Sequence, residues 1–195
     1  MNLPNKLTVS RFVLTAAFLV AVFSNWRYGD TLGLVLFSLA GLTDYFDGKL
    51  ARKYKLITNF GILMDPLADK ILVCSAFIAF IERDWMPAWM VIIVVARELA
   101  ITGLRLLAAS KNVVLAAERF GKHKTISQIV AIISLLVLHS YLLWGPIGLI
   151  FGIKIFGHPW VEAFAETAKW VAVILTFQSG VIYLWRNRSL YLDDL

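Results

Sequence analysis

The sequence predicts an all-α, polytopic membrane protein with six transmembrane helices. Of its 195 residues, 59% are hydrophobic and the mean hydropathy is +0.74, which is far more apolar than a soluble domain. The apolar residues gather in runs of about 20, the length that crosses a bilayer core. Six such runs occupy nearly the whole chain, so we expect a single membrane domain over residues 1–195.

The first span is expected at Thr8–Phe23, after a short polar start at Met1–Leu7. Asn5 or Thr8 is a possible helix cap, because both side chains accept hydrogen bonds from backbone amides. Arg11 lies near the start of this span, and its long side chain can extend toward the membrane interface.

The later spans are separated by short polar or aromatic turns. They are expected at Thr31–Arg52, Thr58–Phe80, Pro87–Ala108, Lys122–Leu143 and Val161–Trp185. The stretch Trp144–Trp160 is apolar but broken by glycines and prolines, which leaves open a partly buried loop or a shallow re-entrant segment. Arg186–Leu195 reads as a short polar tail.

Basic residues predict the orientation of these spans. One set of connections and span ends collects fourteen lysines and arginines, and the other set collects four. Positive residues prefer the cytoplasmic side, so both termini are expected in the cytoplasm. The net charge of +6 is explained by this bias and by anionic lipids, so nucleic acid is not an expected partner. The single cysteine, Cys74, excludes an intrachain disulfide.

Four aspartates at the ends of two apolar segments carry the main functional signal. Asp44 and Asp47 are three residues apart and Asp65 and Asp69 are four apart, so each pair shares one face of a helix. Unpaired carboxylates are unfavourable there. An all-oxygen donor set favours Mg²⁺ or Mn²⁺ over Zn²⁺. The alternative is a structural ion-pair cluster with nearby lysines and arginines.

These residues form part of a longer pattern, D-x2-D-G-x2-A-R-x8-G-x3-D-x3-D. Its fixed positions here are Asp44, Asp47, Gly48, Ala51, Arg52, Gly61, Asp65 and Asp69. The pattern resembles the signature of the CDP-alcohol phosphotransferase family, and every fixed position matches. The resemblance extends over nearly the full chain and is weakest over Trp144–Trp160.

The resemblance implies a role for each signature residue. Asp44, Asp47 and Asp65 would hold one metal ion, Asp44, Asp65 and Asp69 would hold a second, and Asp69 would also be the general base. The side of the site that binds the CDP-lipid is implied to comprise Asn5, Thr8, Gly48, Ala51, Arg52, Thr58 and Gly61. Thr58 is equally well explained as a helix cap.

The implied reaction is the attack of an acceptor hydroxyl on CDP-diacylglycerol, with CMP leaving. Cationic side chains near the carboxylates favour a phosphorylated acceptor. They are Arg97, Arg105, Lys122 and Lys124. The strings 97–105 and 121–125 resemble those of bacterial members that use glycerol 3-phosphate, which implies a bacterial inner-membrane location. The bias of the basic residues predicts that the site faces the cytoplasm. Relatives are commonly homodimers, so a dimer is expected by analogy.

Other acceptors and another class of protein remain open at this point. Members of the same family make cardiolipin or phosphatidylinositol phosphate with a related site. A divalent-cation transporter also places acidic residues in its spans. Here the aspartates cluster at one face of the membrane, and Glu98 is the only acidic residue midway along another span, which argues against a transport pathway.

Overall fold

The structure is a computed structural model that describes residues 3–24, 26–54, 59–111, 113, 115, 120–155 and 157–192. Within helices it describes the backbone alone at residues 3, 4, 44–54, 59, 62, 63, 120 and 122. The described chain is mostly helical. Its long helices are α1 (Leu3–Phe23), α2 (Gly29–Tyr54), α3 (Asn59–Glu82), α4 (Ala88–Ser110), α5 (Phe120–Ser140) and α7 (Trp160–Arg186).

These helices lie where the sequence placed its apolar runs. Within the described residues, three of them are long and apolar enough to cross a membrane: Asn5–Phe23, His123–Leu143 and Trp160–Arg186. The fold therefore fits an all-α protein embedded in a membrane. Pro66 lies inside α3, which continues on both sides of it.

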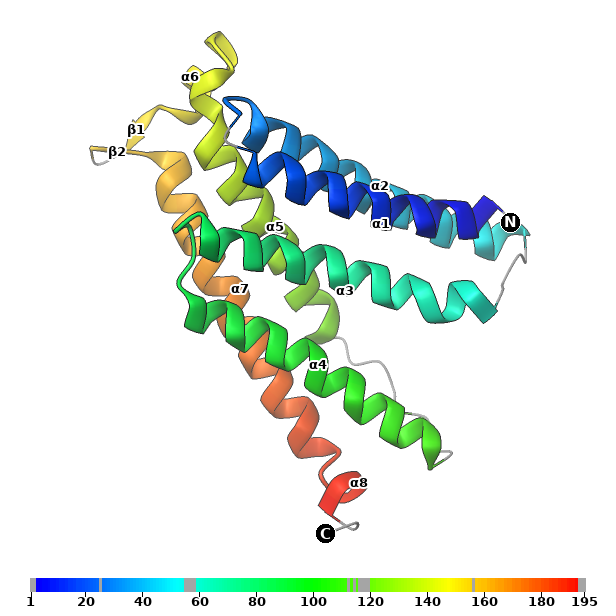
Figure 1. Cartoon of the computed structure of the whole chain (residues 1–195). Helices are drawn as coiled ribbons and strands as arrows, with labels where there is room; N and C mark the ends of the chain where they lie inside the picture. Colours follow the sequence, from blue (N-terminus) through cyan, green and yellow to red (C-terminus); the bar gives the residue numbers. More distant parts are fainter. Residues whose placement is uncertain are drawn as a thin grey trace.

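The helices alternate in direction and form one bundle (Figure 1). α1 packs along α2 and α3, α4 contacts α3 and α7, and α5 joins the two groups through α2 and α7. One end of the bundle carries the N-terminus, the C-terminal end of α2 and the start of α3 (Figure 1). The short turns α1–α2 and α3–α4 lie at the opposite end, which we call the turn end.

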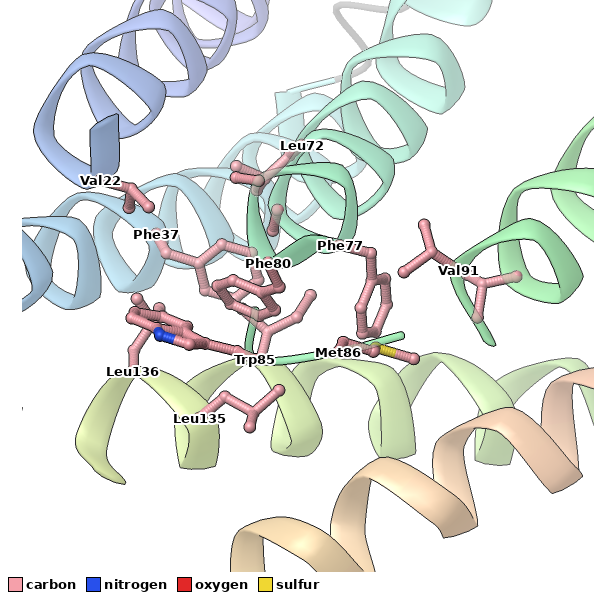
Figure 2. Packing of buried hydrophobic residues seen from close by; sticks show 14 of the residues in the cluster. Val22, Phe37, Leu72, Phe77, Phe80, Trp85, Met86, Val91, Leu135 and Leu136 are labelled. Carbon is pink, nitrogen blue, oxygen red and sulfur yellow. The ribbon is translucent and has the colours of Figure 1, made fainter. Parts of the chain in front are cut away.

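A hydrophobic core holds the turn end together. Phe77, Phe80 and Met86 are at most 2% exposed and pack with residues of α1, α2, α4 and α5 (Figure 2). Phe77 and Phe80 meet edge to face, with ring centroids 6.3 Å apart. Trp85 stacks on His139 of α5 with 3.9 Å between the centroids. Burial of these large rings supplies most of the favourable packing that fixes the helices here.

Two segments differ from the sequence-based expectation. α1 begins by Leu3, so Thr8 lies inside the helix and is not its cap. The expected polar tail contains a short helix, α8 (Ser189–Leu192), and Lys111 Nζ donates to the Leu190 carbonyl at 2.8 Å. Docking of this segment against α4 gives its backbone and side chains partners that its composition did not predict.

The stretch between α5 and α7 folds into small elements. They are the 3₁₀ turn η1 (Tyr141–Leu143), the helix α6 (Pro146–Phe151) and an antiparallel hairpin of β1 (Lys154–Ile155) and β2 (His158–Pro159). Most of its large apolar side chains are exposed, which argues against a partly buried loop. The hairpin also departs from a purely helical fold.

Candidate active site

The two aspartates of α3 face polar residues of α1. Thr8 Oγ1 donates to Asp65 Oδ1 at 2.5 Å, and Arg11 Nη1 donates to Asp69 Oδ1 at 2.6 Å. Thr8 and Arg11 are three residues apart, while Asp65 and Asp69 are four apart. Each pair therefore lies on one helix face, and α1 and α3 run in the same direction, so Thr8 meets Asp65 and, about one turn further on, Arg11 meets Asp69.

Arg11 does not extend to the membrane interface as the sequence suggested. Its side chain is fully buried, whereas the side chain of Asp69 is 49% exposed. A guanidinium removed from solvent requires a charged or hydrogen-bonded partner, because burial of a lone charge is strongly unfavourable. The carboxylate of Asp69 provides that partner, and the buried Arg11 in turn fixes one of its oxygens.

The other signature residues are only partly described. Asp44, Asp47, Gly48, Ala51 and Arg52 lie in the last turns of α2, but their side chains are outside the described atoms, and Thr58 lies outside the described residues. The convergence of the two aspartate pairs therefore stays a prediction. Gly61 is buried near the start of α3, and Asn5 is half-buried on α1.

The described part of the site fits a hard divalent cation by its chemistry. Asp65 and Asp69 contribute carboxylate oxygens one helical turn apart, the ligand type that Mg²⁺ and Mn²⁺ prefer. Among the described side chains, no cluster of three or more His, Cys, Asp or Glu forms a metal site. The two aspartates of α2 that would complete the set are not among those side chains.

A polar pocket of about 250 Å³ opens beside Asp69, between α3, α4 and α5. Its described lining includes four cationic side chains, Lys70, Arg97, Arg105 and Lys124. The acidic side chains that line it are Asp69 and Glu98. A pocket with this excess of positive charge suits a small anion, and its position places that anion next to the carboxylate of Asp69.

Glu98 organises the inner wall of the pocket. Its carboxylate accepts hydrogen bonds from Lys124 Nζ and from Arg97 Nη1, the latter at 3.3 Å. The side chains of Glu98 and Lys124 are each 8% exposed. The carboxylate of Glu98 thus compensates the charges of Arg97 on α4 and Lys124 on α5. Charges that are removed from water need such a partner.

The remaining polar groups tie the outer wall to neighbouring helices. Lys70 Nζ donates to Thr102 Oγ1 at 2.6 Å, and Thr102 Oγ1 donates to the Glu98 carbonyl at 2.6 Å. Arg105 Nε donates to the Tyr183 hydroxyl of α7 at 3.3 Å. Lys70 and Arg105 reach the pocket without a carboxylate hydrogen bond among those that the described residues make, so their charge is available to a bound anion.

The structure brings Arg97, Arg105 and Lys124 together, as the sequence-based interpretation of the cationic residues required. Lys122 lies in α5, but its side chain is outside the described atoms. Sequence reasoning missed Lys70 and Gln128 as pocket residues. A signal existed for both, because Lys70 directly follows Asp69, and Gln128 lies one helical turn after Lys124 on the same face.

Comparison with known proteins decides the family. The model of the CDP-alcohol phosphatidyltransferase family matches residues 1–178. The chain belongs to this family. It is 41% identical to a CDP-diacylglycerol–glycerol-3-phosphate 3-phosphatidyltransferase of Bacillus subtilis, over 95% of both chains. A protein with the same name from Rickettsia felis is 35% identical over 93% of both chains. Another from Salmonella typhimurium is 32% identical over 99% of this chain and 98% of the relative.

The match to the family model covers every residue of the candidate site except Tyr183. The matched residues 1–178 include α1 and the four aspartates, together with the cationic residues of the pocket. The chain is thus a CDP-alcohol phosphatidyltransferase in which the Asp65–Asp69 face and the cationic pocket adjoin at Asp69.

Proposed function

We propose that this phosphatidyltransferase transfers the phosphatidyl group of CDP-diacylglycerol to glycerol 3-phosphate, which yields phosphatidylglycerophosphate and CMP. The observation that carries the proposal is the position of Asp69, which lies on the Thr8–Asp65 face and also lines the cationic pocket. A carboxylate between a nucleotide site and an anion site suits the deprotonation of a phosphorylated acceptor. The names of the relatives support the same two substrates.

Asp69 is assigned the role of general base. It accepts the proton of the acceptor hydroxyl while that oxygen forms a bond to the phosphorus attached to diacylglycerol. The bond from this phosphorus to the bridging oxygen breaks, and CMP leaves with the electron pair. Arg11 holds one oxygen of Asp69 at 2.6 Å, and the side chain stays 49% exposed, which leaves the carboxylate accessible to substrates.

The acceptor phosphate is assigned to the cationic pocket. Lys70 and Arg105 are the first contacts expected, because Arg97 and Lys124 already bind Glu98. Lys122 belongs to the same group by its position at the start of α5. Hydrogen bonds between such cations and a phosphate are charge-assisted, and they fix the acceptor relative to Asp69.

Mg²⁺ or Mn²⁺, as two ions, is the proposed cofactor, held by Asp44, Asp47, Asp65 and Asp69. When bound, such ions neutralise a diphosphate and stabilise the charge that develops on the leaving oxygen. The Thr8 hydroxyl, which donates to Asp65, would orient this carboxylate as a ligand. The CDP-lipid is assigned to the surrounding residues Asn5, Thr8, Gly48, Ala51, Arg52, Thr58 and Gly61.

We further propose a single domain with six spans, both termini in the cytoplasm and the site at the cytoplasmic face of a bacterial inner membrane. The N-terminus and the start of α3 share one end of the bundle, which supports this arrangement (Figure 1). In this arrangement Asp65 and Asp69 would lie where a polar acceptor from water meets a lipid from the bilayer. A homodimer remains a proposal by analogy with relatives.

The test is an acceptor panel with the purified protein in lipid–detergent micelles. CDP-diacylglycerol is supplied with glycerol 3-phosphate, phosphatidylglycerol or inositol phosphate, and CMP release is measured. Release with glycerol 3-phosphate alone is the expected result. Preferred use of phosphatidylglycerol or inositol phosphate would assign a different acceptor, and Mg²⁺ uptake into proteoliposomes without any CMP release would indicate a transporter.

A further inference from the structure

The segment between α5 and α7 presents a dense group of large apolar side chains to its surroundings. The exposed fractions are 80% for Leu142, 74% for Leu149, 65% for Ile147, 59% for Ile150, 57% for Ile153 and 55% for Ile155. Soluble surfaces rarely gather so many apolar side chains in one short stretch. The segment lies far along α5 from Lys124, at the turn end of the bundle (Figure 1).

The neighbouring helices indicate what surrounds this segment. It connects α5 to α7, and both are long and apolar enough to cross a membrane. A short connection between two such helices has both of its ends at a membrane boundary. Its apolar side chains also continue onto the exposed face of α7, where Phe164 is 48% exposed and Trp170 is 47% exposed.

The backbone beneath these exposed apolar side chains is held in place by hydrogen bonds and by one close contact. Trp144 Nε1 donates to Thr31 Oγ1 of α2 at 3.1 Å, and Trp160 Nε1 donates to the Ile150 carbonyl at 2.8 Å. Gly148 holds α6 close to η1, since a Cβ at this position would lie 2.1 Å from the Tyr141 carbonyl oxygen. The segment is therefore an ordered platform with an apolar outer surface.

The hairpin limits how deeply the segment can enter the bilayer. β1 and β2 pair over two residues each, so the outer edges of the hairpin need water or lipid headgroups as hydrogen-bond partners. Lys154 is exposed on β1 and suits lipid phosphates. Trp26 and Tyr28, at the same end, are 58% and 43% exposed, as aromatic residues at a membrane–water interface often are.

We propose that residues 141–155 and 157–160 form an interfacial membrane anchor whose partner is the phospholipid leaflet opposite the Asp65–Asp69 site. The side chains of Leu149 and Ile150 enter the acyl region, while Lys154 stays at the phosphate level. The indole of Trp144 fixes the platform to α2, and the indole of Trp160 fixes α7 to α6 within it. The anchor sets the tilt of α5 and α7 from the side of the membrane remote from the reaction.

The depth of single nitroxide labels in liposomes tests the proposal. Labels are attached to cysteine at Leu149→Cys, Lys154→Cys and the lipid-facing reference Val181→Cys, each combined with Cys74→Ala. Collision rates with O₂, which concentrates in lipid, and with a water-soluble nickel complex are compared. We expect the O₂-to-nickel ratio at position 149 to approach that at 181 and to exceed that at 154 several-fold.

Two outcomes would overturn the anchor. A ratio at 149 as low as at 154 would place the segment in water, and protection of 149 from both agents would show that a protein, such as a second copy of the chain, covers it. A second measurement uses the chain without substitutions, so its result does not depend on how the cysteine variants fold. Photolabelling in liposomes by a lipid-soluble carbene should modify residues 147–155 as strongly as the exposed face of α7, and their lack of labelling would also exclude the anchor.

Discussion

The two ends of the bundle bury an arginine–aspartate pair in different ways. At the turn end, Arg83 of the α3–α4 turn donates to both oxygens of Asp30 at 3.2 and 3.0 Å, and the arginine is 28% exposed. At the site end, Arg11 is fully buried and Asp69 is 49% exposed. The exposed partner is the cation in the first pair and the carboxylate in the second.

We interpret the Arg83–Asp30 pair as structural and propose a chemical role for the Arg11–Asp69 pair. The Arg83 guanidinium also lies 5.1 Å from the ring of Trp85, within the aromatic core of the turn end, so the pair closes a packed region. At the site end the cation is hidden and a carboxylate is presented beside an anion pocket. The carboxylate of Asp69 is accessible from outside the bundle, and the buried guanidinium of Arg11 beneath it fixes its orientation.

The largest expected effect is the loss of CMP release when divalent cations are removed. The four carboxylates predicted to converge at the site end would repel one another and require cations to offset that repulsion. Excess chelator should abolish the activity, and added Mg²⁺ or Mn²⁺ should restore it. The thermal midpoint of the turn-end core, followed by tryptophan fluorescence, should change far less. Full CMP release in excess chelator would contradict the metal assignment.

The next largest effect distinguishes Asp69 at the site end from Asp30 at the turn end. Asp69→Asn should lower the rate of CMP release by about 10²–10⁴, the usual contribution of a general base, with modest change in CDP-lipid binding. Asp30→Asn is the matched control, because it removes the same charge from an arginine pair at the other end. It should leave turnover near normal. Near-normal turnover in Asp69→Asn would assign the proton to another group.

A substitution in the turn-end core should lower stability and leave the kinetic constants unchanged. Phe80 is fully buried, and Phe80→Ala should lower the free energy of unfolding by about 3–5 kcal/mol, the usual result of truncating a core phenylalanine. The KM values of the folded fraction should stay unchanged, because the ring lies in the turn-end core. Thermal inactivation in detergent measures the first effect, and initial rates at low temperature measure the second. A change in acceptor KM would show that the two ends are coupled.

A smaller effect is expected in the cationic pocket. Arg105→Ala should raise the KM for glycerol 3-phosphate about ten- to a hundredfold, because a charge-assisted hydrogen bond contributes roughly 1.5–3 kcal/mol. The KM for the CDP-lipid should barely change. Lys124→Ala is predicted to act in the same direction and in addition leaves Glu98 with Arg97 alone. Arg188→Ala, a charge on the chain after α7, is the control. If both pocket variants keep the same KM for glycerol 3-phosphate, these charges do not bind the acceptor and instead set the orientation of the helices in the membrane.

The smallest effect is expected for the structural ion pair itself. Asp30→Asn should lower the free energy of unfolding by roughly 1 kcal/mol, since the amide oxygen still accepts one hydrogen bond from Arg83. Arg83→Gln should act similarly, with turnover retained. Thermal inactivation measures both variants. A loss of turnover without a loss of stability would place this pair in the chemistry and erase the distinction between the two ends.

The sequence by itself determined the helical class and the approximate position of each long helix, and it predicted the residues that carry the chemistry. Runs of about 20 apolar residues leave few alternatives to a helix in a membrane, because backbone groups there must pair within their own segment. Asp65 and Asp69 were recognisable because carboxylates at the ends of such runs are unfavourable without a function. Their fixed spacing from Asp44 and Asp47 also identified the family.

Only the tertiary structure decided which side chains meet across helices. Arg11 and Asp69 are 58 residues apart, and Lys124 and Glu98 are 26 apart. A helix that is apolar on most of its surface carries no periodic signal of which face turns inward, so the partner of Arg11 was not readable, and its side chain was expected at the interface. The platform formed by residues 141–155 and 157–160 was undecided for the same reason, since its exposed leucines and isoleucines resemble core residues until the surrounding helices are placed.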